Sequence, residues 1–251
     1  MSLKHAAGPP LGRVGGIEGK PRTMSATKTD SDSVMQHRVN AAITAMEGTI
    51  LTNLFGTPLM VHKWANSTAL NSELRDAILR FETKAQSMPR TNVGGWHSEP
   101  GKLEFCGAAG ATLIERMYAM GHEATTLVLR AYGHQPKTFQ WTLHAWANVN
   151  RQGNFNVMHT HPGSTWSGTY YVDTGVEEPT TAKVAPLYLL DPCIGRATTF
   201  LPTLLPSSFT VRPEPGLMVM FPSYLAHMVF PQEANGARIS IAFNLRREPF
   251  P

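Results

Sequence analysis

The sequence predicts a mainly β protein, a sandwich or barrel of short strands preceded by two helices. From Gln135 onward, short β-rich runs follow one another at roughly ten-residue spacing, and Pro or Gly separates nearly every pair. Two stretches with helical periodicity, residues 66–83 and 108–130, come before these runs. The 251 residues are 42% hydrophobic and only 16% charged, a balance that allows one large buried core.

The N-terminal part has a different composition. Residues 1–35 are rich in Gly, Pro, Lys and Ser and show no apolar periodicity, so we expect a flexible extension there. Residues 36–251 are expected to form a single domain. A first strand-like segment in this domain, residues 49–64, is interrupted by Gly56 and Pro58.

The two predicted helices carry apolar residues at steps of three and four, which places these residues on one face of each helix. Asn66 or Ser67 would cap the first helix. A Gly-rich loop, residues 91–101, separates the two helices. The positions expected to face the core are Leu70, Leu74, Ile78 and Phe81 in the first helix, and Leu113, Met117, Ala124 and Leu127 in the second.

The predicted strands begin with FQWTLHAWANVN, residues 139–150. Alternation along this run places Leu143 and Ala145 on one face and Thr142 and His144 on the other. The later runs are NFNVMHTH, TWSGTYYV, APLYLLD, SSFTVRP, GLMVMFP, HMVFPQ and ARISIAFNLR. So many short runs favour an antiparallel sandwich or barrel.

Charge and cysteine content argue against several classes of protein. The net charge of +4 comes from scattered Lys and Arg residues without a dense basic stripe, so we expect no nucleic-acid partner. Cys106 and Cys193 form no CxxC, which favours a reduced, cytoplasmic setting. No apolar run approaches the roughly 18 residues of a membrane span, and residues 1–33 lack the apolar stretch of a secretory signal. The sequence is compatible with a homodimer and does not decide the oligomeric state.

Two histidines one residue apart stand in VMHTHPGSTWSGTYYV, residues 157–172. Successive side chains of a β-strand point to opposite faces, so His159 and His161 would project from the same face. Two imidazoles on one face of a strand can meet one metal ion. Such a pair also arises by chance on surface strands.

A second group of polar residues follows in FPSYLAHMVFPQEANGARISIAFNLR, residues 221–246. His227 begins a short predicted strand, and Arg238 and Ser240 share one face of the last one, opposite a face of Ile239, Ile241 and Phe243. An unpaired guanidinium inside a barrel is costly, so Arg238 requires an anionic partner. The partner is either a ligand carboxylate, which the planar fork of Arg matches, or a local acid such as Glu233.

The order HxH, distal His and Arg-x-Ser resembles the oxygenases of the double-stranded β-helix, or jelly-roll, fold that use Fe(II) and 2-oxoglutarate. Three segments, NVGGWHS (92–98), MHTHPGSTWSGTYYV (158–172) and GLMVMFPSYLAHMVFP…ARISIAFN (216–244), resemble the bacterial and phage 2OG-Fe(II) oxygenases more narrowly. The resemblance covers about residues 49–246. It implies a double-stranded β-helix (jelly-roll, cupin-like) core with flanking helices.

The resemblance also implies an activity. Fe(II), 2-oxoglutarate as cosubstrate and O2 would together hydroxylate an unactivated C–H bond of a small molecule or an amino-acid-like or peptide side chain, with release of succinate and CO2. Arg238 and Ser240 would hold the far carboxylate of 2-oxoglutarate, and Tyr171 would lie within reach of it. Two other functions stay open: a cupin-like, His-ligated metalloenzyme without 2-oxoglutarate, and a jelly roll that binds a ligand without turnover.

The family's usual carboxylate ligand is absent, because His161 stands in its place. We expect His159, His161 and His227 to form a three-histidine face, which Fe(II) accepts. Alternatively, His161 is the first ligand and Gly163 occupies the carboxylate position. A third arrangement would recruit an acid from elsewhere, such as Asp173 or Asp191. The residues expected to contact substrate are Asn148, Asn156 and Trp166.

Overall fold

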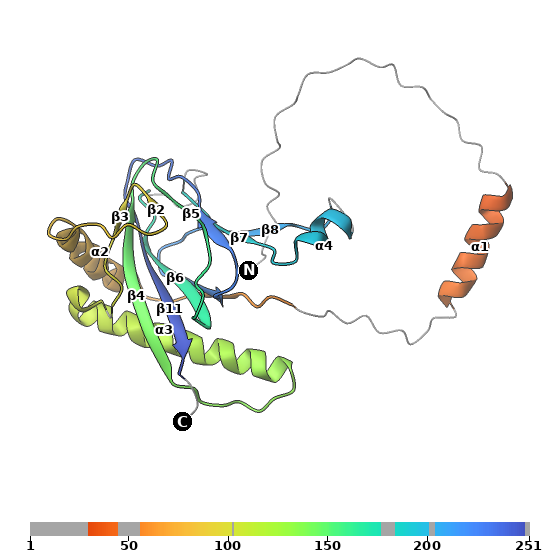
Figure 1. Cartoon of the computed structure of the whole chain (residues 1–251), viewed down its shortest axis with the longest axis horizontal. Helices are drawn as coiled ribbons and strands as arrows, with labels where there is room; N and C mark the ends of the chain where they lie inside the picture. The colour runs from red at the N-terminus through yellow and green to blue at the C-terminus, as the bar shows by residue number, and fades with distance from the viewer. Residues whose placement is uncertain (1–29, 45–55, 102, 177–183, 201–203, 249–251) are drawn as a thin grey trace, which may run out of the picture. The chain divides into compact units, whose positions relative to one another are not determined.

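The computed structural model describes residues 30–44, 56–101, 103–176, 184–200 and 204–248 (Figure 1). By its internal contacts the chain divides into two units, residues 1–56 and 57–251. The described part of the first unit is helix α1 (Asp30–Thr44), together with Gly56. Residues 1–29 of the predicted extension lie outside the described residues, as do residues 49–55 of the first strand-like segment. The predicted division into an extension and a single domain therefore stays a prediction.

The second unit contains two antiparallel sheets. The larger one, here the major sheet, has the strand order β1 (Met60–Lys63), β9 (Leu217–Pro222), β6 (Trp166–Asp173), β11 (Arg238–Arg247), β4 (Trp141–Asn150) and β3 (Trp96–His97). The minor sheet has the order β2 (Asn92–Val93), β5 (Phe155–His159), β10 (His227–Val229), β7 (Leu187–Leu190) and β8 (Ser208–Val211). This architecture confirms the prediction of a mainly β protein with flanking helices.

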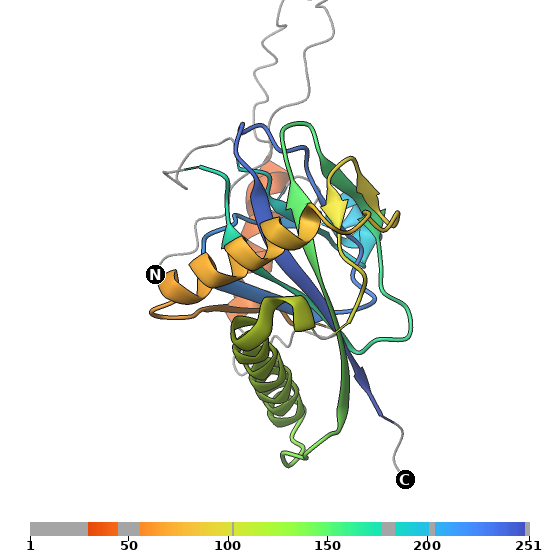
Figure 2. The same cartoon turned by 90° about the vertical axis from the view of Figure 1, so that its left-hand side faces the viewer.

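Helices α2 (Thr68–Glu82) and α3 (Gly107–Ala131) cover one face of the major sheet (Figure 2). A short 3-10 turn, η1 (Glu104–Cys106), leads into α3, and a six-residue helix, α4 (Ile194–Thr199), follows β7. Both long helices lie where the helical periodicity predicted them. Ser67 occupies the N-cap position of α2, although its hydroxyl accepts no hydrogen bond from the helix N–H groups and donates instead to the Trp64 carbonyl oxygen.

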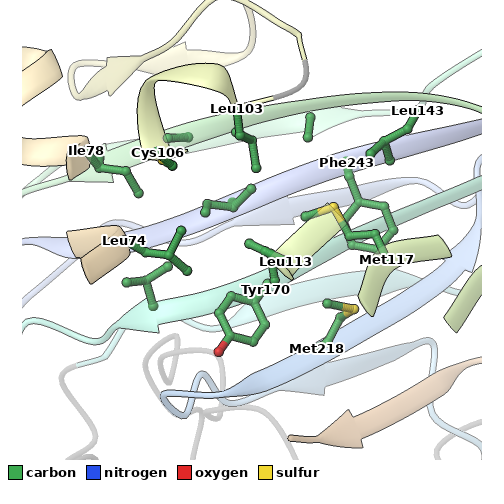
Figure 3. Close-up of a cluster of buried hydrophobic side chains, with 14 of the residues drawn as sticks. Leu74, Ile78, Leu103, Cys106, Leu113, Met117, Leu143, Tyr170, Met218 and Phe243 are labelled. Atoms are coloured by element: carbon green, nitrogen blue, oxygen red, sulfur yellow. The ribbon is translucent and has the colours of Figure 1, made fainter. Parts of the chain in front are cut away.

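The main hydrophobic core lies between these helices and the major sheet (Figure 3). Each of the four central strands contributes a fully buried side chain: Leu143 from β4, Tyr170 from β6, Met218 from β9 and Phe243 from β11. The helices contribute Leu74, Ile78, Leu113, Met117 and Ala124, as their periodicity predicted.

One core prediction for α3 was wrong. Leu127 is 48% exposed, and Val128 packs against the core in its place. The buried positions along the helix continue from Met120 and Ala124 to Val128 in steps of four, which brings position 128 and not 127 over the sheet.

The Gly-rich loop connects the two sheets. It contains strand β2 of the minor sheet and strand β3 of the major sheet, joined by Gly94 and Gly95. Both glycines have left-handed backbone conformations, with φ of +65° and +64°, which side chains with a Cβ rarely adopt. Among the helices of the described residues, none is long and apolar enough to cross a membrane.

Candidate metal centre

A cavity of about 330 Å³ opens between the inner faces of the two sheets. Alternate residues of β4 and β11 line it, because the residues between them point to the helices. In β6, Ser167 and Thr169 line it together with the intervening Gly168, which has no side chain. The lining from the major sheet consists of His97 of β3, Phe221 of β9, and His144, Trp146 and Asn148, Ser167, Gly168 and Thr169, and Arg238, Ser240, Ala242 and Asn244 of β4, β6 and β11. The major sheet thus has one apolar face against the helices and one polar face toward the cavity.

Three histidines meet at this cavity. His159 is the last residue of β5, and His227, the first residue of β10, is its cross-strand partner. His161 lies two residues beyond the end of β5, and its backbone N–H donates to the carbonyl oxygen of Ser223 over 3.0 Å. The nitrogen atoms that the three rings can offer to a metal all lie within 4.8 Å of one another.

The sequence therefore located the cluster correctly but explained it incompletely. Strand alternation applies only up to His159, because the strand ends there. His161 reaches the cluster because the turn after the strand is hydrogen-bonded, through the His161 N–H, to Ser223 in the segment that precedes His227. Gly163, the alternative carboxylate position, lies in the same turn with φ of +86°.

Two of the imidazoles are oriented by the backbone. His159 Nδ1 lies 2.7 Å from the Val157 carbonyl oxygen, and His227 Nδ1 lies 2.8 Å from the Leu225 carbonyl oxygen. A carbonyl oxygen only accepts, so each Nδ1 carries a proton, and each Nε2 is left with a free lone pair. This is the outer hydrogen bond that fixes the tautomer of metal-binding histidines.

The surroundings favour the uncharged form of all three rings. Burial, together with the nearby His159, lowers the pKa of His227 to about 3. Burial and the same neighbour lower the pKa of His161 to about 4, and burial lowers the pKa of His159 as well. Near neutral pH all three are therefore uncharged, which is the form that binds metal.

Arg238 lines the cavity and has no acidic partner among the described residues. It is 2% exposed, its Nη1 donates to Ser240 Oγ over 3.3 Å, and its Nε has no hydrogen-bond partner. Glu233, the local acid considered from the sequence, is exposed and forms no ion pair with it. A buried guanidinium in this state fits an anionic ligand.

Tyr171 lies beside this arginine. The Arg238 guanidinium carbon is 5.2 Å from the centre of the Tyr171 ring, and the buried Tyr171 hydroxyl has no hydrogen-bond partner. Burial raises the pKa of Tyr171 to about 12, against the opposing effect of the Arg238 charge, so the hydroxyl keeps its proton. Two unpartnered polar groups, Arg238 Nε and Tyr171 Oη, are thus buried next to each other.

The other predicted site residues divide into two groups. Asn148 and Asn156 line the cavity. Trp166 does not line it: it is buried on the helix side, where its Nε1 donates to Thr125 Oγ1 of α3 over 2.9 Å, so its position gives no support to the predicted role in substrate contact. By strand alternation Trp166 shares the face of Tyr170 and not that of Tyr171.

The acids considered as alternative ligands are engaged elsewhere. Asp173 forms an ion pair with Arg75 over 2.9 Å, and Asp191 forms one with Arg196 over 2.9 Å. Neither belongs to the histidine cluster. The cavity also contains Ser167 and Asn244, to which the sequence argument gave no role, although alternation along β11 beyond Ser240 pointed to Asn244.

Comparison with solved structures identifies the fold. A Pseudomonas putida prolyl-4-hydroxylase matches with a TM-score of 0.53 and 17% identity over 83% of this chain and 99% of that one. A Trichoplax adhaerens prolyl hydroxylase in complex with a hypoxia-inducible-factor peptide matches with a TM-score of 0.52 and 11% identity, over 88% of this chain and 94% of that one. HygX from Streptomyces hygroscopicus, with nickel and 2-oxoglutarate bound, matches with a TM-score of 0.50 and 12% identity, over 77% of this chain and 84% of that one.

The chain thus has the double-stranded β-helix fold of these oxygenases, with helices on the outer face of the major sheet. Residues 144–244 match the model of the family described as "Putative 2OG-Fe(II) oxygenase". The match spans strands β4 to β11 and confirms the family resemblance that the sequence motifs suggested. No curated protein sequence matches the chain.

Proposed function

We propose that this chain is an Fe(II)- and 2-oxoglutarate-dependent dioxygenase that hydroxylates an unactivated C–H bond of a small molecule or an amino-acid-like or peptide side chain and releases succinate and CO2. The observation that carries the proposal is a buried arginine without an acidic partner in the same cavity as three neutral histidines. The first group fits a dicarboxylate cosubstrate, and the second fits a divalent metal.

The histidine cluster fits Fe(II) by the chemistry of its donors. His159, His161 and His227 would hold the ion through neutral imidazoles, and the Val157 and Leu225 carbonyl oxygens fix two of the rings. Three neutral ligands leave the full charge of the ion uncompensated by the protein. We therefore expect weaker iron retention than in a site with a carboxylate ligand.

The part of the cavity at Arg238 fits the far carboxylate of 2-oxoglutarate. Arg238 would pair with this carboxylate, and the hydroxyls of Ser240 and Tyr171 would donate to it. Ser240 and Tyr171 are cross-strand partners on β11 and β6, and Ser240 follows Arg238 on the same face of β11. Both residues are therefore neighbours of Arg238. Such binding would satisfy Arg238 Nε and Tyr171 Oη, which otherwise have no partner.

The chain itself supplies orientation and exclusion of water, whereas the bound iron and cosubstrate supply the oxidising chemistry. The apolar side chains of Phe221, Leu187 and Val229 line the cavity beside the histidines and limit the access of water. Asn148 and Asn156, which present amides to the same cavity, would orient the substrate. Their placement supports the predicted role of these two residues.

Anaerobic absorption spectroscopy tests the proposal. Addition of Fe(II) and 2-oxoglutarate to the full chain should produce the metal-to-ligand charge-transfer band of the chelated cosubstrate. Arg238→Gln should weaken 2-oxoglutarate binding by about 2–5 kcal/mol, because a charge-assisted pair is lost, while iron still binds. Arg75→Gln, which removes a half-exposed guanidinium from the helix side, serves as the matched control and should match the parent.

The same experiment separates the competing functions. If no band develops at saturation although iron is bound, the chain is a histidine-ligated metalloenzyme that does not use 2-oxoglutarate. If the band develops but no candidate substrate stimulates succinate release, the chain binds the cosubstrate without turnover. Equal 2-oxoglutarate affinity in Arg238→Gln and the parent would make Arg238 a structural residue.

A further inference from the structure

A row of polar side chains crosses the major sheet at the end of the cavity away from Arg238. Asn244 of β11 pairs with Ser167 of β6 on one side and with His144 of β4 on the other. All three side chains line the cavity. Arg238 and Asn244 are six positions apart on one strand, which corresponds to about 20 Å at the usual rise of a strand.

This row lies close to the histidine cluster. Ser167 is the cross-strand partner of Phe221, and the Phe221 ring centre is 4.8 Å from that of His227. Trp146 is the next residue after His144 on the cavity face of β4. Its ring centre lies 5.8 Å from that of His161. The polar row therefore lies beside the histidine cluster and six strand positions from Arg238, a span longer than the five-carbon cosubstrate, so a cosubstrate held by Arg238 leaves the row free.

One hydrogen bond sets the orientation of the Asn244 amide. Ser167, which is 1% exposed, donates its hydroxyl proton to Asn244 Oδ1 over 2.7 Å. The oxygen is thereby occupied as an acceptor, and Nδ2 faces away with two N–H donors. Among the described residues, Nδ2 has no hydrogen-bond acceptor, and it is not shut off from the cavity. Asn244 thus presents donors that the protein does not use.

The charges around the cavity favour the same type of ligand. Among the described residues that line the cavity there is no Asp or Glu. The lining does include two arginines, Arg90 and Arg238, and five histidines. A cationic group would find no counter-charge there, and burying a charge without one is costly. An oxygen acceptor, neutral or negatively charged, is matched by the Asn244 donors.

From these observations we infer that Asn244, oriented by Ser167 and flanked by His144, is a substrate-binding subsite for a carboxylate or carboxamide oxygen. The inference rests on the proposed function and narrows its substrate class to acyl compounds that are neutral or anionic. Asn244 donates to the substrate oxygen. Ser167 is a positioning residue that keeps the amide turned toward the substrate.

The test is a calorimetric titration of the full chain with Fe(II) and saturating 2-oxoglutarate, without O2, so that no turnover occurs. The probes are N-acetyl-L-alanine, which carries a carboxylate, N-acetyl-L-alaninamide, which is neutral, and isopropylamine, a cation without an acyl oxygen. We expect the two acyl probes to bind and the amine not to bind.

The variants test the assignment to Asn244. Asn244→Asp replaces the donors by a carboxylate at the same volume and should weaken N-acetyl-L-alanine binding on the order of tenfold or more. Asn235→Asp adds the same charge at an exposed position outside the cavity and should leave this binding unchanged. Ser167→Ala, which removes the orienting hydroxyl, should weaken the binding of both acyl probes by about three- to tenfold.

Each outcome decides a specific point. The subsite is overturned if neither acyl probe binds, if the amine binds as tightly as the acyl probes, or if Asn244→Asp behaves like Asn235→Asp. If 2-oxoglutarate itself does not bind in the anaerobic absorption experiment, the proposed function and the subsite are both overturned. If 2-oxoglutarate binds and only the probe results fail, the proposed function stands without the subsite.

Discussion

The two faces of strand β11 show two different uses of one backbone. The side that faces α2 and α3 carries four side chains with no exposed surface: Ile239, Ile241, Phe243 and Leu245. The side that faces the cavity carries Arg238, Ser240, Ala242 and Asn244. Burial of the first set stabilises the fold, whereas burial of Arg238 costs free energy until a ligand compensates for it.

This difference means that stability and ligand binding depend on separate sets of residues within the same ten-residue strand. Substitutions toward the helices should change the free energy of unfolding and leave the cavity's ligands bound. Substitutions toward the cavity should change ligand binding with smaller effects on unfolding. The following predictions test this separation.

The largest effect is expected at the histidines. His159→Ala, His161→Ala and His227→Ala should each weaken Fe(II) binding by at least about 100-fold, because loss of even an outer-shell partner can cost 10–100-fold. His161→Asp should retain iron, since it restores a two-histidine, one-carboxylate face. Iron stoichiometry after desalting measures both effects. An iron-replete His159→Ala protein would contradict the three-histidine site and favour the alternative built on His161 and Gly163.

On the opposite face, Phe243→Ala should lower the free energy of unfolding by about 3–5 kcal/mol, because it leaves a cavity in a fully buried cluster. Ser240→Ala, three positions away on the cavity face, should lower it by about 1 kcal/mol or less. Denaturant unfolding of the metal-free protein measures both values. Similar losses in the two variants would show that the faces are not energetically distinct.

The buried histidines make the stability of the metal-free protein depend on pH. Burial lowers the pKa of His161 and His227 from 6.5 to about 4 and about 3. Between these values and 6.5 the unfolded chain binds protons that the folded one does not, so stability should fall as pH falls from 6.5 toward 4. Above 6.5 these groups should have no effect.

The variant His227→Gln tests this effect, because it removes the histidine whose pKa is lowered most. Its free energy of unfolding should fall less steeply between about pH 6.5 and pH 4 than that of the parent. Denaturant unfolding at a series of pH values gives the two curves. Parallel curves would mean that His227 is not buried in its neutral form.

The smallest effect should distinguish two adjacent tyrosines of β6. Tyr170 points to the helices and donates to Asn71 Oδ1 over 2.6 Å, whereas Tyr171 points to the other face with an unpartnered hydroxyl. Tyr170→Phe should destabilise the fold by about 1 kcal/mol and leave 2-oxoglutarate binding unchanged. Tyr171→Phe should weaken 2-oxoglutarate binding by about 1 kcal/mol without loss of stability. A reversed pattern would contradict the assignment of the two faces.

Local periodicity was sufficient to predict several features of this protein. Alternation correctly placed Ile239, Ile241 and Phe243 in the core, opposite Arg238 and Ser240. Steps of three and four located both long helices. These features follow from the sequence because the direction of a side chain within a regular element depends only on the backbone geometry of that element.

Long-range contacts decided the rest. Only the fold shows that Asp173 and Asp191 are held in ion pairs away from the cluster, and that Arg238 has no such partner among the described residues. His161 joins the cluster through a bond from a turn to Ser223, 62 positions away in the sequence. Strand register and turn contacts join residues that are distant in sequence, and no local pattern encodes which distant groups will meet. The hydrophobic pattern thus determined the faces, and tertiary packing determined which polar groups were left for a ligand.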